Sequence, residues 1–227
     1  MDYQTINPYD GQLTKTFPVL SAGELENKIA SAAACFDHWQ GTSFAQRASV
    51  VAKAAALMRS RKEEMAHLVT VEMGKLIAES RGEVDVSADI LDYYAQHAES
   101  FLAVEKLHPK HGEAEVHSSP FGVLLGVQPW NFPYYQLARF AAPNIMAGNV
   151  VMVKHAGCVP QSALAFERLW TDAGAPQGVY TNLFATYDQV DALIDDARIK
   201  GVALTGSVEA GKAVAERAGR NLKKSTM

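Results

Sequence analysis

Residues Phe121-Gly-Val-Leu-Leu-Gly-Val127 and, one residue later, Pro129-Trp-Asn-Phe-Pro133 decide the fold of this 227-residue chain. The first stretch is a short apolar run bounded by Pro and Gly, which is typical of a buried parallel strand. From Tyr134 to Ala147 apolar side chains recur at helical spacing, and Gly148-Asn149 ends them. The Pro-rich stretch is therefore predicted to be a stiff loop at the carboxyl end of a strand, where open α/β sheets bind ligands. Asn131, held between the two prolines, is placed to direct its side-chain amide at a developing oxyanion.

Strands and helices are expected to alternate from residue 121 onward. Apolar runs bounded by turn residues predict strands near 121–127, 150–154, 179–184 and 200–205. Helical spacing predicts helices near 134–147, 161–173 and 188–197, and a last helix that begins near Val208. Crossovers of this length are typical of right-handed βαβ units. The fold class is therefore α/β, with a parallel sheet flanked by helices.

The first 120 residues differ from this pattern. Residues 1–20 carry the turn signals Asn7-Pro8 and Asp10-Gly11, so we expect a turn-rich segment there. From about 22 to 103 apolar residues recur at three- and four-residue spacing, which predicts packing helices. Residues 104–120 are charged and short of apolar residues, which indicates an exposed segment.

Composition excludes several classes of protein. The net charge of −4 argues against a nucleic-acid partner, because phosphate binding requires a basic face. No apolar stretch approaches the roughly 20 residues of a membrane span, and the N-terminus lacks the features of a signal peptide. Cys35 and Cys158 lie far apart and form no metal-type pair. A cytoplasmic protein without a bound metal is expected.

Four motifs, taken in order and spacing, resemble the NAD(P)-dependent aldehyde dehydrogenase superfamily. They are Glu72-Met-Gly-Lys75, which is the weakest match, Pro129 to Pro133, Val151-Met-Val-Lys154 and Leu204-Thr-Gly-Ser207. The resemblance extends from Asn7-Pro8 to Met227 and is strongest to bacterial succinate-semialdehyde dehydrogenases, which the Lys-His-Ala sequence after the second strand also resembles. No G-x-G-x-x-G follows a predicted strand, which agrees with this family and not with a standard Rossmann dehydrogenase.

The resemblance implies a division of the chain into three parts. Residues 1–103 would be the helical part of the cofactor-binding domain, 104–120 a β-hairpin for assembly of a homo-oligomer, and 121–227 a Rossmann-like core. Family members continue with a Glu-Leu-Gly-Gly motif that holds the general base, and then with a catalytic Cys. Because residues 223–227 resemble the stretch before that Glu, we expect the chain to be truncated before the catalytic domain and inactive alone.

The chemistry implied is oxidation of an aldehyde to an acid. A cysteine thiolate attacks the aldehyde, and Asn131 helps to stabilise the oxyanion. Hydride passes to the nicotinamide, and a water activated by Glu hydrolyses the resulting thioester. Of these parts the chain is expected to supply Asn131 and most of the cofactor site.

Cofactor residues are implied at the ends of three predicted strands. Trp130 lies in the loop of the oxyanion residue, and Lys154 would hydrogen-bond the adenosine ribose. Gly206 would permit close backbone approach, while Ser207 and the helix that contains Gly211 would face the pyrophosphate. In many relatives an acidic residue lies three positions after the lysine, where this chain has Gly157. A carboxylate would repel a 2′-phosphate, so we expect NADP⁺ to be accepted as well as NAD⁺.

Two residues on the helix after the Pro-rich loop are substrate candidates. An Arg at the position of Arg139 binds the distal carboxylate of the substrate in succinate-semialdehyde dehydrogenases. A planar guanidinium suits bidentate carboxylate recognition, although a surface ion pair would also explain it. Gln136, about one turn earlier, is expected to face the same cleft.

Two other kinds of function are possible interpretations of the sequence. Gly206, Gly211 and Lys212 match the G-x-x-x-x-G-K of a P-loop, but Ala213 stands where a Ser or Thr should bind Mg²⁺. The other alternative is a non-catalytic interaction protein that kept the fold.

The remaining chemistry-bearing residues are given structural interpretations. Cys158 is expected to be a small buried side chain and not a nucleophile. The residues His108, His111 and His117 fit no common metal spacing. Glu72 and Lys75 are interpreted as solvated charges at the end of a helix.

Overall fold

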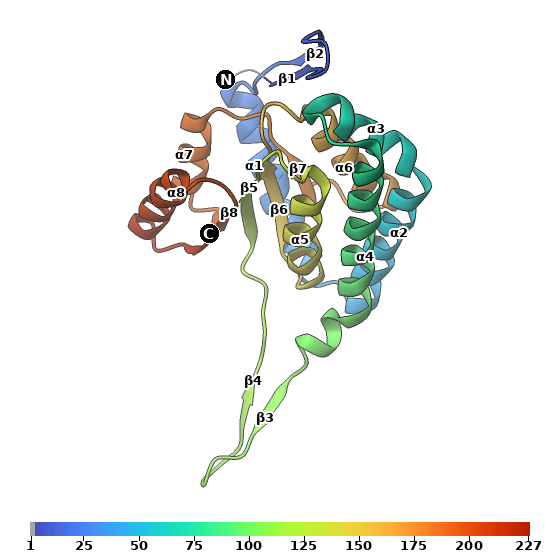
Figure 1. The fold of residues 1–227 in the computed structure, drawn as a ribbon. Coiled ribbons are helices and arrows are strands. Elements are labelled where there is room, and N and C mark those ends of the chain that lie inside the picture. The colour runs from blue at the N-terminus through green and yellow to red at the C-terminus, as the bar shows by residue number, and fades with distance from the viewer. Residues whose placement is uncertain (1–2) are drawn as a thin grey trace.

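A computed structural model describes residues 3–227, and its centre is a parallel sheet of five strands in the order β7-β6-β5-β8-β9 (Figure 1). The strands are β5 (Val123–Val127), β6 (Val150–Lys154), β7 (Tyr180–Asn182), β8 (Ile199–Leu204) and β9 (Lys224–Thr226). All four ladders are parallel. The predicted α/β class and the first four strands are confirmed.

One helix connects each pair of successive strands in the parallel sheet, as expected for βαβ units. The helices are α5 (Pro133–Met146), α6 (Pro160–Ala173), α7 (Tyr187–Asp195) and α8 (Val208–Arg220). The chain moves from β5 toward β7 and then returns to β8 on the other side of β5. This reversal places α5 and α6 on one face of the sheet, and α7 and α8 on the other.

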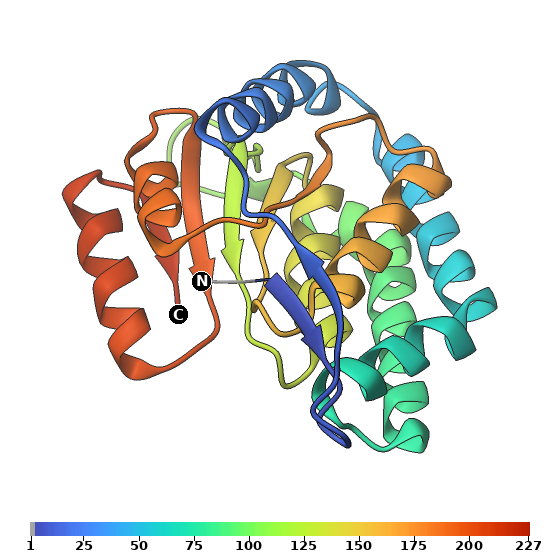
Figure 2. The same ribbon diagram turned by 90° about the horizontal axis from the view of Figure 1, so that it is seen from above.

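The predicted helical region contains four helices, α1 (Ala22–Trp39), α2 (Phe44–Ser60), α3 (Lys62–Met73) and α4 (Ile77–Phe101). Ser21 and Ser43 begin α1 and α2 with capping boxes, and Gly74 ends α3 with a left-handed φ of 78°. α1 packs on the sheet, while α2, α3 and α4 cover α5 and α6. α7 and α8 therefore lie at one side of the molecule and the helical layer at the other (Figure 2).

The core lies between the sheet and these helices. Every residue of β6 is buried, as expected for a central strand covered on both faces. A Cβ atom on Gly126 of β5 would lie 2.5 Å from Cε1 of Phe140 on α5. Glycine at this position therefore lets α5 approach the strand that carries the Pro-rich loop.

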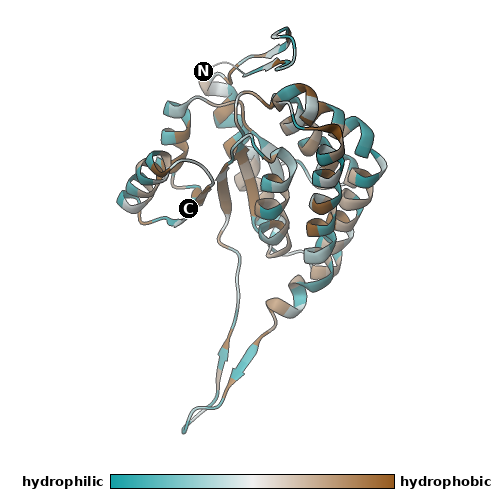
Figure 3. Ribbon diagram, in the orientation of Figure 1, coloured by the Kyte–Doolittle hydropathy of each residue, from teal (hydrophilic) through white to brown (hydrophobic). Residues whose placement is uncertain are grey.

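Two hairpins extend the fold. β3 (Glu105–Leu107) and β4 (Ala114–Val116) form the predicted hairpin, which projects far from the sheet (Figure 1) and is largely hydrophilic (Figure 3). β1 (Tyr3–Ile6) pairs with β2 (Leu13–Phe17). The expectation of only a turn-rich segment at residues 1–20 was therefore incomplete. β9 was also missed, because its three residues are all exposed and carry no apolar pattern.

Candidate functional site

Three loops meet at the carboxyl edge of the sheet. The register pairs Val127, the last residue of β5, with Lys154 at the end of β6 and Leu204 at the end of β8. Backbone hydrogen bonds continue past the strands, from the Gln128 N–H to the Lys154 carbonyl and from the Thr205 N–H to the Val127 carbonyl, both at 3.0 Å. The Pro-rich loop thus lies at the end of a strand, as predicted.

The strand order reverses at this edge. β6 lies on one side of β5 and β8 on the other, so the loops after β5 and β8 flank a topological switch point. In open α/β sheets the crevice at such a point is where ligands bind. The loop containing Asn131 follows β5, and the loop containing Gly206 and Ser207 follows β8, so both loops lie at this point.

The loop after β5 presents its side chains outward. Trp130 is 51% exposed and Phe132 47% exposed, and Asn131 between them is also exposed. Pro133 then begins α5 at the first helical position, where its fixed φ is favourable. The backbone carbonyl of Asn131 accepts a hydrogen bond from Nζ of Lys75 at 2.9 Å. The loop is thus fixed through its backbone while its side chains face outward.

His155 is a second support of this loop, and it was not among the predicted site residues. Its ring is buried, with Nδ1 3.2 Å from the Gln128 carbonyl and Nε2 3.2 Å from the Pro133 carbonyl. Burial lowers the pKa of His155 to about 4, although both carbonyls oppose this. The ring is therefore neutral and donates to one carbonyl at a time. The only feature of the sequence that could have indicated His155 as a site residue is its position next to Lys154.

Lys154, the last residue of β6, places a cation at the carboxyl edge of the sheet. The residue is 4% exposed, and Nζ lies 5.1 Å from the ring centroid of Tyr187. Burial lowers the pKa of Lys154 to about 8. The carbonyl of Gly157 accepts the Gln4 N–H at 3.0 Å, and the position carries no side-chain charge. A buried ammonium beside an uncharged turn fits a polyhydroxylated or anionic ligand group.

The loop after β8 has the geometry of an anion site. Ser207 is the N-cap of α8, and its Oγ accepts the Ala210 N–H at 3.2 Å, which leaves the hydroxyl proton free to donate. Gly206 is exposed, and a Cβ there would lie 3.3 Å from Cδ2 of Leu204. A Cβ on Gly211 would meet nothing within 4 Å. The helix N-terminus is therefore accessible to a phosphate group.

The P-loop alternative does not fit this geometry. α8 already begins at Val208, so the four residues between Gly206 and Gly211 include a helical turn. Lys212 is exposed in the second turn of the helix. A P-loop instead needs these residues as an open loop whose N–H groups surround phosphates. We therefore reject this interpretation.

The substrate candidates lie on α5 in different environments. Arg139 is exposed, with its guanidinium carbon 5.7 Å from the ring centroid of Tyr135. Gln136 is 6% exposed, and its Oε1 has no hydrogen-bond partner within residues 3–227. The two side chains therefore do not share one open surface in this part of the protein.

Two structural interpretations from the sequence were wrong. Cys158 is exposed and not buried, although partial burial of the thiol raises its pKa. Glu72 and Lys75 are not solvated charges: Glu72 is 3% exposed, and the Lys75 side chain is 8% exposed and pairs with Glu83. These residues bond groups far along the chain, so the local sequence contains no sign of their partners.

No group of three metal-ligating side chains is found within residues 3–227. A hollow with a volume of about 710 Å³ lies between α1, α6 and β7. None of the predicted site residues lines it. The candidate site is instead placed at the carboxyl ends of β5, β6 and β8.

Comparison with known proteins identifies the family of the chain. The model of the aldehyde dehydrogenase family matches residues 1–227. The chain belongs to the aldehyde dehydrogenase family. A relative within the family, the succinate-semialdehyde dehydrogenase [NADP(+)] of Deinococcus radiodurans, is 48% identical over 222 residues, which are 98% of this chain and 46% of the relative.

Two further family members extend the comparison. The succinate semialdehyde dehydrogenase [NAD(P)+] Sad of Escherichia coli K12 is 41% identical over 97% of this chain and 48% of its own length. The crystal structure of succinic semialdehyde dehydrogenase from Streptococcus pyogenes in complex with NADP⁺ is 42% identical, with a TM-score of 0.96 over 98% of this chain and 49% of that one.

The chain spans about half the length of the aldehyde dehydrogenases that it matches. Within the residues described, no helix has the length and apolar character needed to cross a membrane.

Proposed function

We propose that this chain is the cofactor-binding half of a succinate-semialdehyde dehydrogenase that uses NAD(P)⁺. The observation that carries the proposal is the meeting of the Asn131 loop and the Ser207 helix N-terminus at the switch point of the sheet. The relatives that match nearly the whole chain are named for this activity. The remainder of the enzyme would supply the cysteine nucleophile and the glutamate base.

The residues present fit a dinucleotide. Ser207 and the first N–H groups of α8 would hold the pyrophosphate, and the ammonium of Lys154 would bond the adenosine ribose. Gly157 adds no negative charge beside that ribose, so a 2′-phosphate would be accepted. When bound, the nicotinamide accepts the hydride of the aldehyde.

Asn131 would act on the substrate side. Its amide would donate a hydrogen bond to the oxyanion that forms when the nucleophile attacks the aldehyde carbon. Arg139, exposed on α5, would bind the distal carboxylate of succinate semialdehyde. Trp130 would cover the cofactor. The β3–β4 hairpin would contribute to assembly with a second copy of the enzyme.

Reduction of the nicotinamide tests this function. The full-length enzyme is mixed with NADP⁺ or NAD⁺ and with either succinate semialdehyde or butanal, which has the same chain length and no carboxylate. We expect kcat/KM to be higher for succinate semialdehyde, with turnover by both cofactors. Absence of nicotinamide reduction with every combination would refute the proposal.

A further inference from the structure

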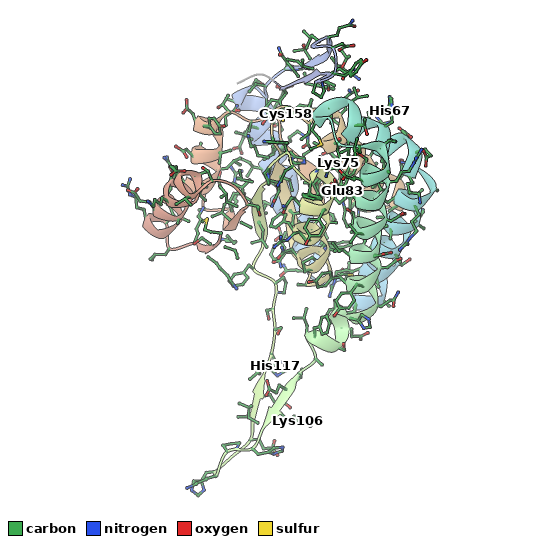
Figure 4. The ribbon with its side chains drawn as sticks, in the orientation of Figure 1. His67, Lys75, Glu83, Lys106, His117 and Cys158 are labelled. Carbon is green, nitrogen blue, oxygen red and sulfur yellow. The ribbon has the colours of Figure 1, made fainter. Side chains whose placement is uncertain are left out.

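The backbone of the Asn131 loop is held by an ion pair from the helical layer. Lys75 lies between α3 and α4, and Glu83 lies on α4. Their side chains form a salt bridge and are only 8% and 1% exposed (Figure 4). The same Lys75 Nζ donates to the carbonyl of Asn131 at 2.9 Å and lies 3.7 Å from the ring centroid of Phe132.

Glu83 completes the contact at the start of α5. Its Oε1 accepts the N–H groups of Tyr134 at 2.8 Å and Tyr135 at 3.3 Å. The N-cap residue of α5, Phe132, provides no side-chain cap of its own. A carboxylate from α4 therefore caps the helix that follows the loop, where the helix dipole favours negative charge.

A buried ion pair is by itself weak evidence for a stabilising role. Replacing both members of a buried ion pair by uncharged groups is often neutral or stabilising, because the desolvation of two charges is expensive. The Lys75 ammonium does, however, hold the carbonyl oxygen of the peptide group between Asn131 and Phe132. This hydrogen bond of 2.9 Å restrains the backbone from which the exposed Asn131 side chain extends.

We propose that Lys75 is a positioning residue that sets the direction of the Asn131 amide, with Glu83 holding the Lys75 ammonium in place. This inference rests on the proposed function, because it requires Asn131 to stabilise an oxyanion. Oxyanion donors act only when they are already directed at the place where charge develops. A change in the Asn131 peptide plane would therefore affect kcat while leaving cofactor binding intact.

A double-mutant cycle in the full-length enzyme tests this role. The variants are Lys75→Met, Asn131→Ala and the combination, each assayed for kcat with succinate semialdehyde and for KM of NADP⁺. We expect Lys75→Met to lower kcat by roughly tenfold or more, since small misplacements at an active site are costly. In the Asn131→Ala background the same substitution should change kcat by less than about twofold, because no amide remains to be misdirected.

Two further variants separate positioning from folding. Lys75→Met combined with Glu83→Gln removes both charges, so thermal stability should recover while kcat stays low. Lys62→Met is the matched control, because Lys62 of α3 pairs with Asp85 of α4 at 3.0 Å in a much less buried position than the Lys75–Glu83 pair. This control should leave kcat unchanged.

Equal losses of kcat from Lys75→Met in the two backgrounds would overturn the positioning role while leaving the proposed function intact. A kcat that recovers together with stability in the Lys75→Met, Glu83→Gln variant would also overturn it. If Asn131→Ala itself does not lower kcat, the oxyanion role of Asn131 and this inference fall together.

Discussion

Glu72, near the end of α3, accepts the backbone N–H of Ser162 at 2.8 Å, although the two residues are 90 positions apart in the chain. Its other oxygen accepts the Gln161 N–H and the Thr5 hydroxyl, both at 2.7 Å. α6 has no side-chain cap of its own, so Glu72 is its cap and also binds β1 to it. Burial raises the pKa of Glu72, and these hydrogen bonds oppose the shift. A single carboxylate thus connects three elements, α3, β1 and α6.

Glu72→Ala should lower the free energy of unfolding by about 3 kcal/mol, because two N–H groups and a hydroxyl lose their acceptor in a buried place. Urea unfolding measures the change. Glu99→Ala, at an exposed position late in α4, is the control and should shift stability by less than about 0.5 kcal/mol. Similar losses for the two variants would show that Glu72 is not a cap.

The sequence alone predicts those elements of the fold that are encoded by neighbouring residues. The apolar runs of β5 and β6 and the glycines that bound them predicted parallel strands, and parallel strands place their following loops at one edge. The position of Asn131 follows from that alone.

Long-range polar contacts had no such signal. From the sequence, Glu72 and Lys75 are interpreted as solvated charges at the end of a helix. The groups that they bond, the Ser162 N–H and the Asn131 carbonyl, are far along the chain, so the neighbouring residues give no sign of them. His155 was missed for the same reason: its two acceptors are backbone carbonyls that only the folded loop brings together. Polar β9 lacks the apolar pattern on which strand prediction depends.

Arg139→Ala should raise KM for succinate semialdehyde by roughly tenfold to a hundredfold and change KM for butanal by less than about twofold. Loss of a charge-assisted hydrogen bond to a carboxylate costs about 1.5–3 kcal/mol, whereas butanal has no carboxylate to lose. Steady-state kinetics with both aldehydes provide the measurement. Equal effects on the two substrates would remove Arg139 from the substrate site.

Gly157→Asp should weaken NADP⁺ binding by tenfold or more and leave NAD⁺ binding within about threefold. The new carboxylate would lie beside the 2′-phosphate and repel it, while the free 2′-hydroxyl of NAD⁺ can donate to it. Titration calorimetry with each dinucleotide gives the two affinities. A parallel loss for both cofactors would place the ribose elsewhere.

Stability should depend on pH through His155. Its pKa is about 4 in the folded protein and 6.5 when unperturbed, so the unfolded chain binds more protons between these values. The contribution of His155 is therefore fully present above pH 6.5 and is lost as pH falls toward 4, by up to roughly 3 kcal/mol. His155→Gln should flatten the profile in this window. Unfolding midpoints at pH 4.5, 5.5 and 7 compare the two proteins, and parallel profiles would contradict a neutral buried ring.

The most direct test of the proposed function is kcat for succinate semialdehyde with NADP⁺ in the full-length enzyme and in its Asn131→Ala variant. Removing one oxyanion donor lowers kcat by about 10²–10³-fold in a comparable site. We expect a fall of this size with KM for NADP⁺ nearly unchanged. A variant that turns over at the rate of the unmodified enzyme would contradict the placement of the oxyanion site at the end of β5.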